Sequence, residues 1–168
     1  NPDSEIDGCS VEGLLLSTNR NKIAKEVLLT LTRDIKFGLV PNGYSGYDNR
    51  PLYNSVDSSL LLFEQVQKYI NYTGDLQFVK ENLYDKLKSI LDNYIVGIDL
   101  DDNNIYLDND NLIVSGTENT QNTWMDAKYG NHCFTPRNGK TVEVNAMWYN
   151  SLKIMQDLSN KFGKRKYK

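Results

Sequence analysis

Apolar residues recur at helical spacing in five segments of the chain, and polar residues fill the positions between them. In the third segment Leu61 and Leu62 widen the apolar stripe, which indicates a helix buried on more than one side. The pattern predicts an all-α fold. The five expected helices cover residues 10–19, 21–37, 55–72, 75–96 and 142–162.

Short and long connections alternate between these helices. The link "YTGD" is short: Gly74 suits a left-handed residue that closes one helix, and Asp75 suits the cap of the next. Short links produce antiparallel helix hairpins. The long connections, about 38–54 and 97–141, then fall on one face of the array, together with the N-termini of the third and fifth helices.

The second long connection contains the tract "IDLDDNNIYLDNDNLIV". Its alternating Asp and Asn resemble a calcium loop, but the required Gly at the sixth position and Glu at the twelfth are missing. Two short apolar runs, "NIYL" and "NLIV", are separated by polar turn residues. We therefore predict a small β-hairpin within the 97–141 connection.

Composition excludes several classes of protein. A chain of 168 residues with a net charge of -3 has the size of one domain and no basic stripe for nucleic acid. No apolar run is long enough for a membrane span, and Cys9 and Cys133 are too few for a disulfide framework. We expect a soluble, cytoplasmic protein whose closing basic residues, 164–168, form a solvated tail. The single His excludes a His-cluster metal site.

The stretch 122–150 carries the most candidate chemistry. Trp124 lies outside any periodic helix and suits a platform on which a sugar ring stacks, whereas Trp148 fits an apolar helix stripe and suits the core. Asp126 lies two residues after Trp124. A carboxyl shielded by an indole keeps its proton more readily and can donate it to a leaving-group oxygen. The alternative for Asp126 is a loop acid that makes a turn or a salt bridge.

Two further acids stand at expected helix starts. Asp57 could accept hydrogen bonds from ligand hydroxyls, or it could be a first-turn acid matched to the helix dipole, with Asn54 or Ser55 as the cap. Glu143 occupies the corresponding place in the fifth helix and leaves the same two interpretations open.

Three ordered motifs resemble the glucosidase part of glycogen debranching enzymes, the amylo-α-1,6-glucosidase family. They are "EGLLLSTNR", "YNSVDSSLLLFEQVQKYINYTGD" and "NTWMDAKYGNHCFTPRNGKTVEVNAMWYNSLKIM", and the resemblance extends from about residue 12 to 163. It implies an (α/α)6 toroid, in which inner and outer helices alternate and the active site lies where the inner helices begin. This chain would form about half of it, with residues 1–163 as a partial glucosidase domain.

The resemblance also implies hydrolysis, with inversion, of the α-1,6-linked glucose at a glycogen branch stub. Asp126, in "TWMDAK", would be the general acid. The partner would be glycogen or another branched α-glucan, with no cofactor and no metal. The residues implied to hold glucose units are Asn54, Asp57, Trp124, Lys128, Arg137, Lys140 and Glu143.

Two departures limit this assignment. The family has a "WGRDT"-like motif before "EGLLL", where this chain reads "NPDSEIDGCSV" with Asp7 as its nearest acid. An inverting enzyme also needs a second carboxylate to activate water, and the family's later helices supply it. We expect the 168-residue chain alone to lack glucosidase activity and to associate through uncovered helix faces. The alternative is a catalytically silent glucan-binding or helical interaction module.

Overall fold

The computed structural model describes residues 11–100, 103–130 and 132–164, and the fold is mostly α with three small antiparallel strand pairs. All five predicted helical segments and the predicted hairpin are confirmed. The expectations for Asp7, Cys9 and the tail at 165–168 lie outside the described residues.

The elements in chain order are η2 (Val11–Leu16), α1 (Asn21–Arg33), β1 (Gly43–Tyr44), β2 (Pro51–Leu52), α2 (Asp57–Thr73), α3 (Leu76–Asn82), α4 (Tyr84–Val96), β3 (Tyr106–Leu107), β4 (Ile113–Val114), β5 (Lys128–Tyr129), β6 (His132–Cys133) and α5 (Val142–Lys161).

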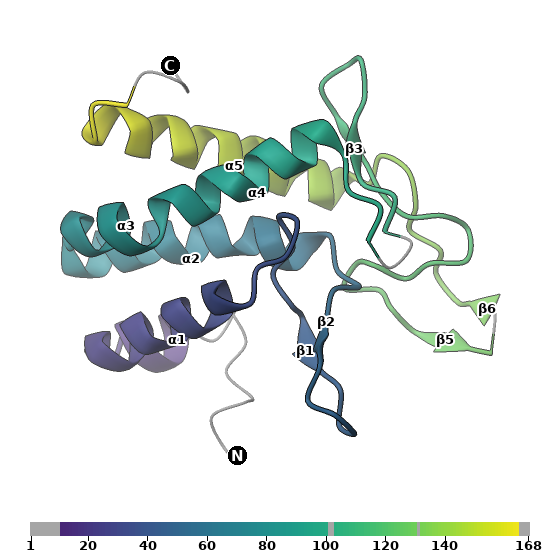
Figure 1. The fold of residues 1–168 in the computed structure, drawn as a ribbon, viewed down its shortest axis with the longest axis horizontal. Helices are drawn as coiled ribbons and strands as arrows, with labels where there is room; N and C mark the ends of the chain where they lie inside the picture. The colour runs from purple at the N-terminus through teal and green to yellow at the C-terminus, as the bar shows by residue number, and fades with distance from the viewer. Residues whose placement is uncertain (1–10, 101–102, 131, 165–168) are drawn as a thin grey trace.

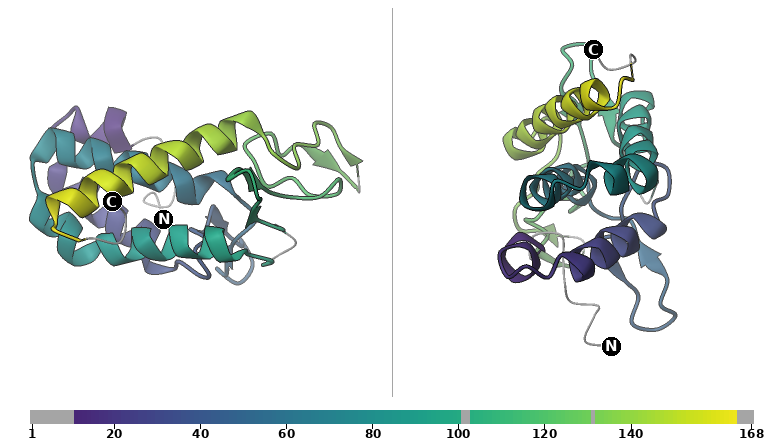
Figure 2. Two further views of the ribbon diagram at one scale, coloured as in Figure 1. Left: turned by 90° about the horizontal axis from the view of Figure 1, so that it is seen from above. Right: turned by 90° about the vertical axis from the view of Figure 1, so that its left-hand side faces the viewer.

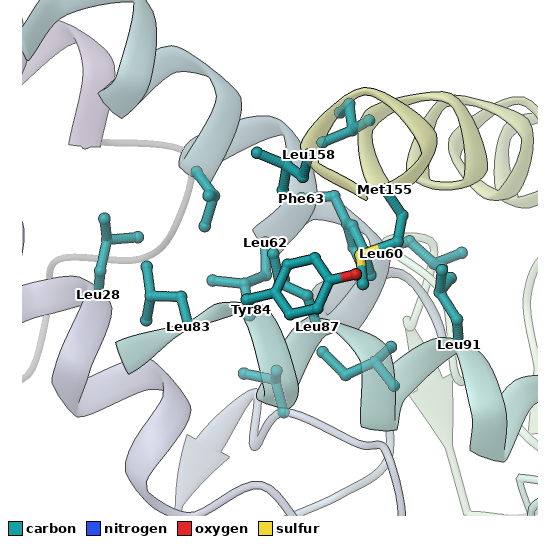
Figure 3. Close-up of a cluster of buried hydrophobic side chains, with 14 of the residues drawn as sticks. Leu28, Leu60, Leu62, Phe63, Leu83, Tyr84, Leu87, Leu91, Met155 and Leu158 are labelled. Atoms are coloured by element: carbon teal, nitrogen blue, oxygen red, sulfur yellow. The ribbon is translucent and has the colours of Figure 1, made fainter. Parts of the chain in front are cut away.

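Helix α2 lies in the middle of the helical array (Figures 1 and 2) and packs most extensively against α5, with further contacts to η2, α1 and α3. This position explains its broad apolar stripe, since Leu60, Leu62 and Phe63 are all buried. They meet side chains from α4 and α5, such as Leu87 and Met155, in the cluster of Figure 3. In the part of the chain that the structure describes, no helix has both the length and the apolar character to span a membrane.

Two helical segments differ from their predicted form. The first is a π-helical turn, in which Ser17 donates its backbone N–H to the Glu12 carbonyl at 3.0 Å, five residues back. The segment 75–96 is divided at Leu83 (φ −117°) into α3 and α4, although Leu87 still donates to the Leu83 carbonyl at 2.9 Å. Leu83 is fully buried, so the bend follows the packing of the core rather than a local breaker residue.

The predicted links between α2 and α3 are confirmed in detail. Gly74 has a left-handed backbone (φ 70°) and donates to the Ile70 carbonyl at 2.8 Å, which closes α2. The Asp75 carboxylate accepts the Phe78 N–H at 3.1 Å and caps α3. Asp75 also pairs with Lys25 of α1 at 2.6 Å, so this turn joins three helices.

The strand pairs all lie at one end of the helical array, beside the starts of α2 and α5 (Figure 1). The sequence predicted this arrangement, and we call this end the loop face: residues 36–56, 97–100, 103–130 and 132–141. The β3–β4 pair is the expected hairpin, with Tyr106 opposite Val114 and Leu107 opposite Ile113. The β1–β2 and β5–β6 pairs were not predicted, because their sequences lack the two apolar runs around a polar turn that marked the β3–β4 hairpin.

Buried asparagines hold the loop face together. The side-chain NH2 of Asn122 donates to the Asn103 backbone carbonyl at 3.1 Å, and the Asn122 backbone carbonyl accepts the Val56 N–H at 2.8 Å. Asn103 in turn donates to the carbonyls of Leu100 (2.7 Å) and Tyr53. Amide side chains thus replace the regular hydrogen bonding that these connections lack.

Candidate functional site

The start of α2 is tied directly to the tract that carries Trp124. Asp57 is 8% exposed, and one carboxylate oxygen accepts the Trp124 backbone N–H at 2.9 Å. The other oxygen accepts the Ser55 hydroxyl at 2.5 Å. Both oxygens of Asp57 therefore serve contacts within the chain, across a separation of 67 residues in the case of Trp124.

The helix-start interpretation of Asp57 is also partly confirmed. The N-cap residue of α2 is Val56, without a side-chain cap bond, so neither Asn54 nor Ser55 occupies the cap. Ser55, one residue earlier, still accepts the Ser58 backbone N–H at 3.2 Å. Asp57 thus combines a first-turn position with a long-range hydrogen bond.

An ion pair lies at the start of α5. The Arg137 guanidinium donates to both oxygens of Glu143, with 2.5 Å between Nε and Oε1. These bonds are the main cause that holds the pKa of Glu143 below its ordinary value, and the Trp124 side chain contributes weakly as a further donor. Trp124 therefore lies between the two acids: its backbone is held by Asp57, and its side chain is near Glu143.

Asp126 lies two residues after Trp124 and is exposed. Among the described residues no hydrogen bond or ion pair to its carboxylate is found. The expectation that an indole shields Asp126 from water is not met in this chain, because the Trp124 side chain is itself 66% exposed. The alternative of a salt-bridged loop acid is not met either. Asp126 therefore lies on the loop face as an exposed carboxyl without a bonding partner among the described residues.

The remaining predicted residues are spread over the loop face. Lys128, on β5, is exposed and donates to the Asn119 carbonyl at 3.2 Å. Lys140 is paired with Asp108 and Asp110, each at 2.7 Å, and so is tied to the β3–β4 hairpin. Asn54 is exposed beside β2.

The sequence did not reveal that two residues, Tyr94 and Asn145, support the loop face. Tyr94 counted only as a core residue, yet its hydroxyl donates to the Val56 carbonyl at 2.7 Å and its ring stacks on the buried Trp148. Burial raises the pKa of Tyr94, so it remains a donor. Asn145 of α5 donates to the Ile113 carbonyl at 3.0 Å and accepts the Ile113 N–H at 2.7 Å. Nothing in the local sequence reveals either contact. The core position of Trp148 is confirmed, at 3% exposed.

A metal site is not formed by the groups that the structure describes, since no cluster of three or more His, Cys, Asp or Glu side chains occurs among them. What residues 11–100, 103–130 and 132–164 offer instead is an exposed carboxyl next to an exposed indole, on a loop held by buried hydrogen bonds. The exposed indole is suited to stacking on a sugar ring, and the carboxyl is accessible to a ligand but lacks the shielding from water that favours proton donation.

The chain forms a helical domain, and its polar connecting segments gather at one end, the loop face. A family profile described as amylo-α-1,6-glucosidase matches residues 8–168, so the chain belongs to that family. The chain is 25% identical over 203 aligned positions to the glycogen debranching enzyme of Saccharomyces cerevisiae. That alignment covers 90% of this chain but 13% of the yeast enzyme's length.

Proposed function

We propose that this chain carries the proton-donating part of an α-1,6-glucosidase site that acts on branch stubs of glycogen or a related cytoplasmic α-glucan, with inversion. Asp126 is the general acid. Family membership and the yeast enzyme's name support the substrate class. Residues 1–163 are the glucosidase portion, about half of an (α/α)6 toroid, and 164–168 are a basic tail.

The observation that carries this proposal is the hydrogen bond between Asp57 and the Trp124 backbone. It fixes the chain two residues before Asp126, so that an exposed acid and an exposed aromatic ring stand on a supported loop. Within the set proposed to hold glucose units, Asn54, Trp124 and Lys128 are exposed for direct contact. Asp57 and the Arg137–Glu143 pair position Trp124 through the contacts described above, and Lys140 holds the β3–β4 hairpin.

The catalytic base comes from outside these residues. An inverting enzyme needs a second carboxylate about 6.5–9.5 Å from the acid, and both Asp57 and Glu143 are engaged in internal hydrogen bonds. The 168-residue chain alone therefore releases no glucose from a limit dextrin. Steady glucose release by the purified chain would contradict this part of the proposal.

Glucan binding can be followed by tryptophan fluorescence, because the two tryptophans differ in exposure. Trp148 is 3% exposed and Trp124 is 66% exposed, so a stacked sugar changes mainly the emission of Trp124. We expect maltooligosaccharides to alter the emission of the wild-type chain and of Tyr72→Ala, which removes an exposed aromatic from the far end of α2. Trp124→Ala abolishes the response. An unchanged spectrum with wild-type chain would refute a sugar platform at Trp124.

A silent glucan-binding module is the second candidate, favoured by the internal engagement of Asp57 and Glu143. The two candidate functions, glucosidase and silent binding module, can be distinguished in a longer protein that contains this domain together with further toroid helices. Asp126→Asn removes glucose release there by at least about a hundredfold if Asp126 is the general acid, while oligosaccharide binding persists. Equal activity of the Asp126→Asn variant would exclude the acid role.

A further inference from the structure

A separate pocket opens on the loop face next to α2. It has a volume of about 520 Å³ and lies around β2 and the turn after α1. This volume is within the range of small-molecule sites, about 300–1,000 Å³. Its lining residues are Lys36, Arg50, Pro51, Leu52, Tyr53, Asn54 and Leu100.

The pocket carries two cations that are not neutralised within it. Among the described residues no carboxylate pairs with Lys36, whose ammonium is placed 5.8 Å from the Phe37 ring. Arg50 has one acidic neighbour, Asp48, at 3.8 Å, and its side chain is 73% exposed. The weak pairing leaves most of the guanidinium donors available for a ligand.

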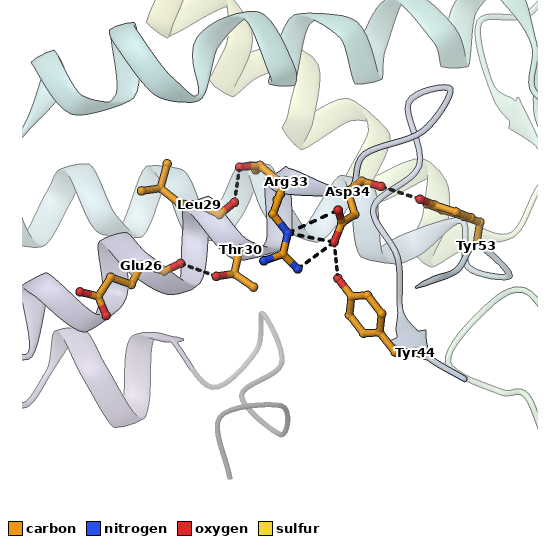
Figure 4. Close-up of polar contacts among 8 residues, drawn as sticks. Glu26, Leu29, Thr30, Arg33, Asp34, Tyr44 and Tyr53 are labelled. Atoms are coloured by element: carbon orange, nitrogen blue, oxygen red, sulfur yellow. Dashed lines mark hydrogen bonds and ion pairs between the residues drawn. The ribbon is translucent and has the colours of Figure 1, made fainter. Parts of the chain in front are cut away.

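Asp34, which follows the last residue of α1, is bound by other partners. Asp34 is bound by Arg33 at 3.0 Å and by the Tyr44 hydroxyl at 2.7 Å (Figure 4). These two partners hold the pKa of Asp34 below its ordinary value. The Asp34 charge is therefore compensated by Arg33, and the described residues that line the pocket include two cations, Lys36 and Arg50, and no acid.

The walls of the pocket are fixed by hydrogen bonds. The Tyr53 hydroxyl donates to the Asp34 carbonyl at 2.6 Å (Figure 4), and the Tyr53 carbonyl accepts from Asn103. Lys36 and Leu39 exchange two backbone bonds, at 3.0 and 2.9 Å, which anchor the turn that carries the lysine. The pocket walls are thus held by bonds within the chain, with apolar sides from Leu52 and Leu100 and an amide from Asn54.

We propose that this pocket binds a phosphate monoester of a glucose unit. An Arg fork and a Lys ammonium together suit a dianion with three acceptor oxygens, whereas a single Arg suffices for a carboxylate. The Asn54 amide and the apolar walls suit the sugar. The glucose part of this inference rests on the proposed function, because Asn54 belongs to the proposed glucan-binding set. The anion part depends only on the pocket and its two cations.

The test is a titration of the ¹⁵N-labelled chain at 0.15 M salt, roughly physiological ionic strength, with glucose 6-phosphate, glucose and inorganic phosphate. We expect glucose 6-phosphate to shift the Arg50 side-chain and Asn54 resonances and to bind more tightly than either other probe. Arg50→Gln and Lys36→Gln each weaken binding about tenfold, the size expected for one charge-assisted hydrogen bond. Lys22→Gln, an exposed lysine at the opposite end of α1, leaves the affinity unchanged.

Three results would overturn the proposal. Equal affinity for glucose and glucose 6-phosphate removes the anion site, and an equal loss in Lys22→Gln shows that general charge attraction alone is at work. Equal affinity for inorganic phosphate removes the sugar part. Trp124→Ala leaves glucose 6-phosphate binding intact, so failure of the fluorescence test with maltooligosaccharides would count against the proposed function and not against this pocket.

Discussion

At the scale of single residues, the loop face depends on carboxylates that bind backbone and side-chain donors far away in sequence. Asp57 illustrates this best, since a residue that opens a helix also holds the tract before Asp126. The Glu143–Arg137 pair acts locally, since its partners lie six residues apart and tie the segment before α5 to the first turn of that helix. Neither acid acts only through the helix dipole, so their substitution affects more than one element.

Asp57→Ala should lower the free energy of unfolding by about 1–3 kcal/mol, because it leaves the Trp124 N–H without its buried acceptor. Urea denaturation followed by circular dichroism measures this. Asp85→Ala is the matched control: Asp85 is an exposed acid in the first turn of α4. Its loss should cost about 0.3–1 kcal/mol, the usual size of a dipole interaction. Equal effects of the two substitutions would mean that the bond to Trp124 adds nothing.

Glu143 should make stability depend on pH. Because Arg137 lowers the folded-state pKa of Glu143 below the ordinary 4.5, the folded protein favours the charged carboxylate. The contribution is therefore fully present above pH 4.5 and is lost as the pH falls through the lowered folded-state pKa. At pH 7 we expect Glu143→Gln to be less stable than wild type by about 1 kcal/mol.

This difference should shrink on acidification below pH 4.5 and should be absent in the Arg137→Gln background. Denaturation curves from pH 3 to pH 7 measure it. A constant difference across this range, or the same difference without Arg137, would show that the pair does not cause the effect.

At the scale of elements, the β3–β4 hairpin is attached to a helix by a side-chain amide rather than by an extended sheet. The β3–β4 hairpin has two residues in each strand, and Asn145 of α5 binds both the N–H and the carbonyl of Ile113. Two-stranded ribbons of this size have little stability of their own. The hairpin therefore keeps its position through α5.

Asn145→Ala should loosen this hairpin while leaving the helical core intact. We expect hydrogen exchange of the Ile113 amide to accelerate about tenfold, since opening no longer breaks the bond to Asn145. Amides of α2 keep their protection. Asn150→Ala, an exposed position on the same helix, should change neither. Unaltered exchange of the Ile113 amide would show that Asn145 does not hold the hairpin in position.

At the scale of the whole molecule, apolar side chains remain uncovered on several helices. Val142 is 81% exposed and Tyr149 is 66% exposed, seven residues apart and thus on one side of α5; Val96, at the end of α4, is 85% exposed. Contiguous exposed apolar surface favours association. The sequence predicted uncovered helix faces and oligomers, and oligomer formation stays a prediction.

Light scattering should show an apparent mass that rises above that of a single chain, 19.3 kDa, as the concentration increases. Tyr149→Lys should weaken this association, because a charged side chain is costly to bury in an apolar contact. Tyr72→Lys alters an exposed aromatic on α2 and should have little effect. A constant mass of one chain up to high concentration would refute association through this face.

The sequence by itself determined the helical segments, the alternation of short and long connections and the β3–β4 hairpin. Periodicity, capping residues and turn residues act over a few neighbours, so they can be identified along the chain. The family motifs likewise identified Asp126 and Trp124 as candidates. The tertiary structure decided which candidates meet. The bond from Asp57 to Trp124, the clamp of Asn145 on Ile113 and the pocket with Lys36 and Arg50 join residues that no periodic pattern connects, because packing of the helices brings them together.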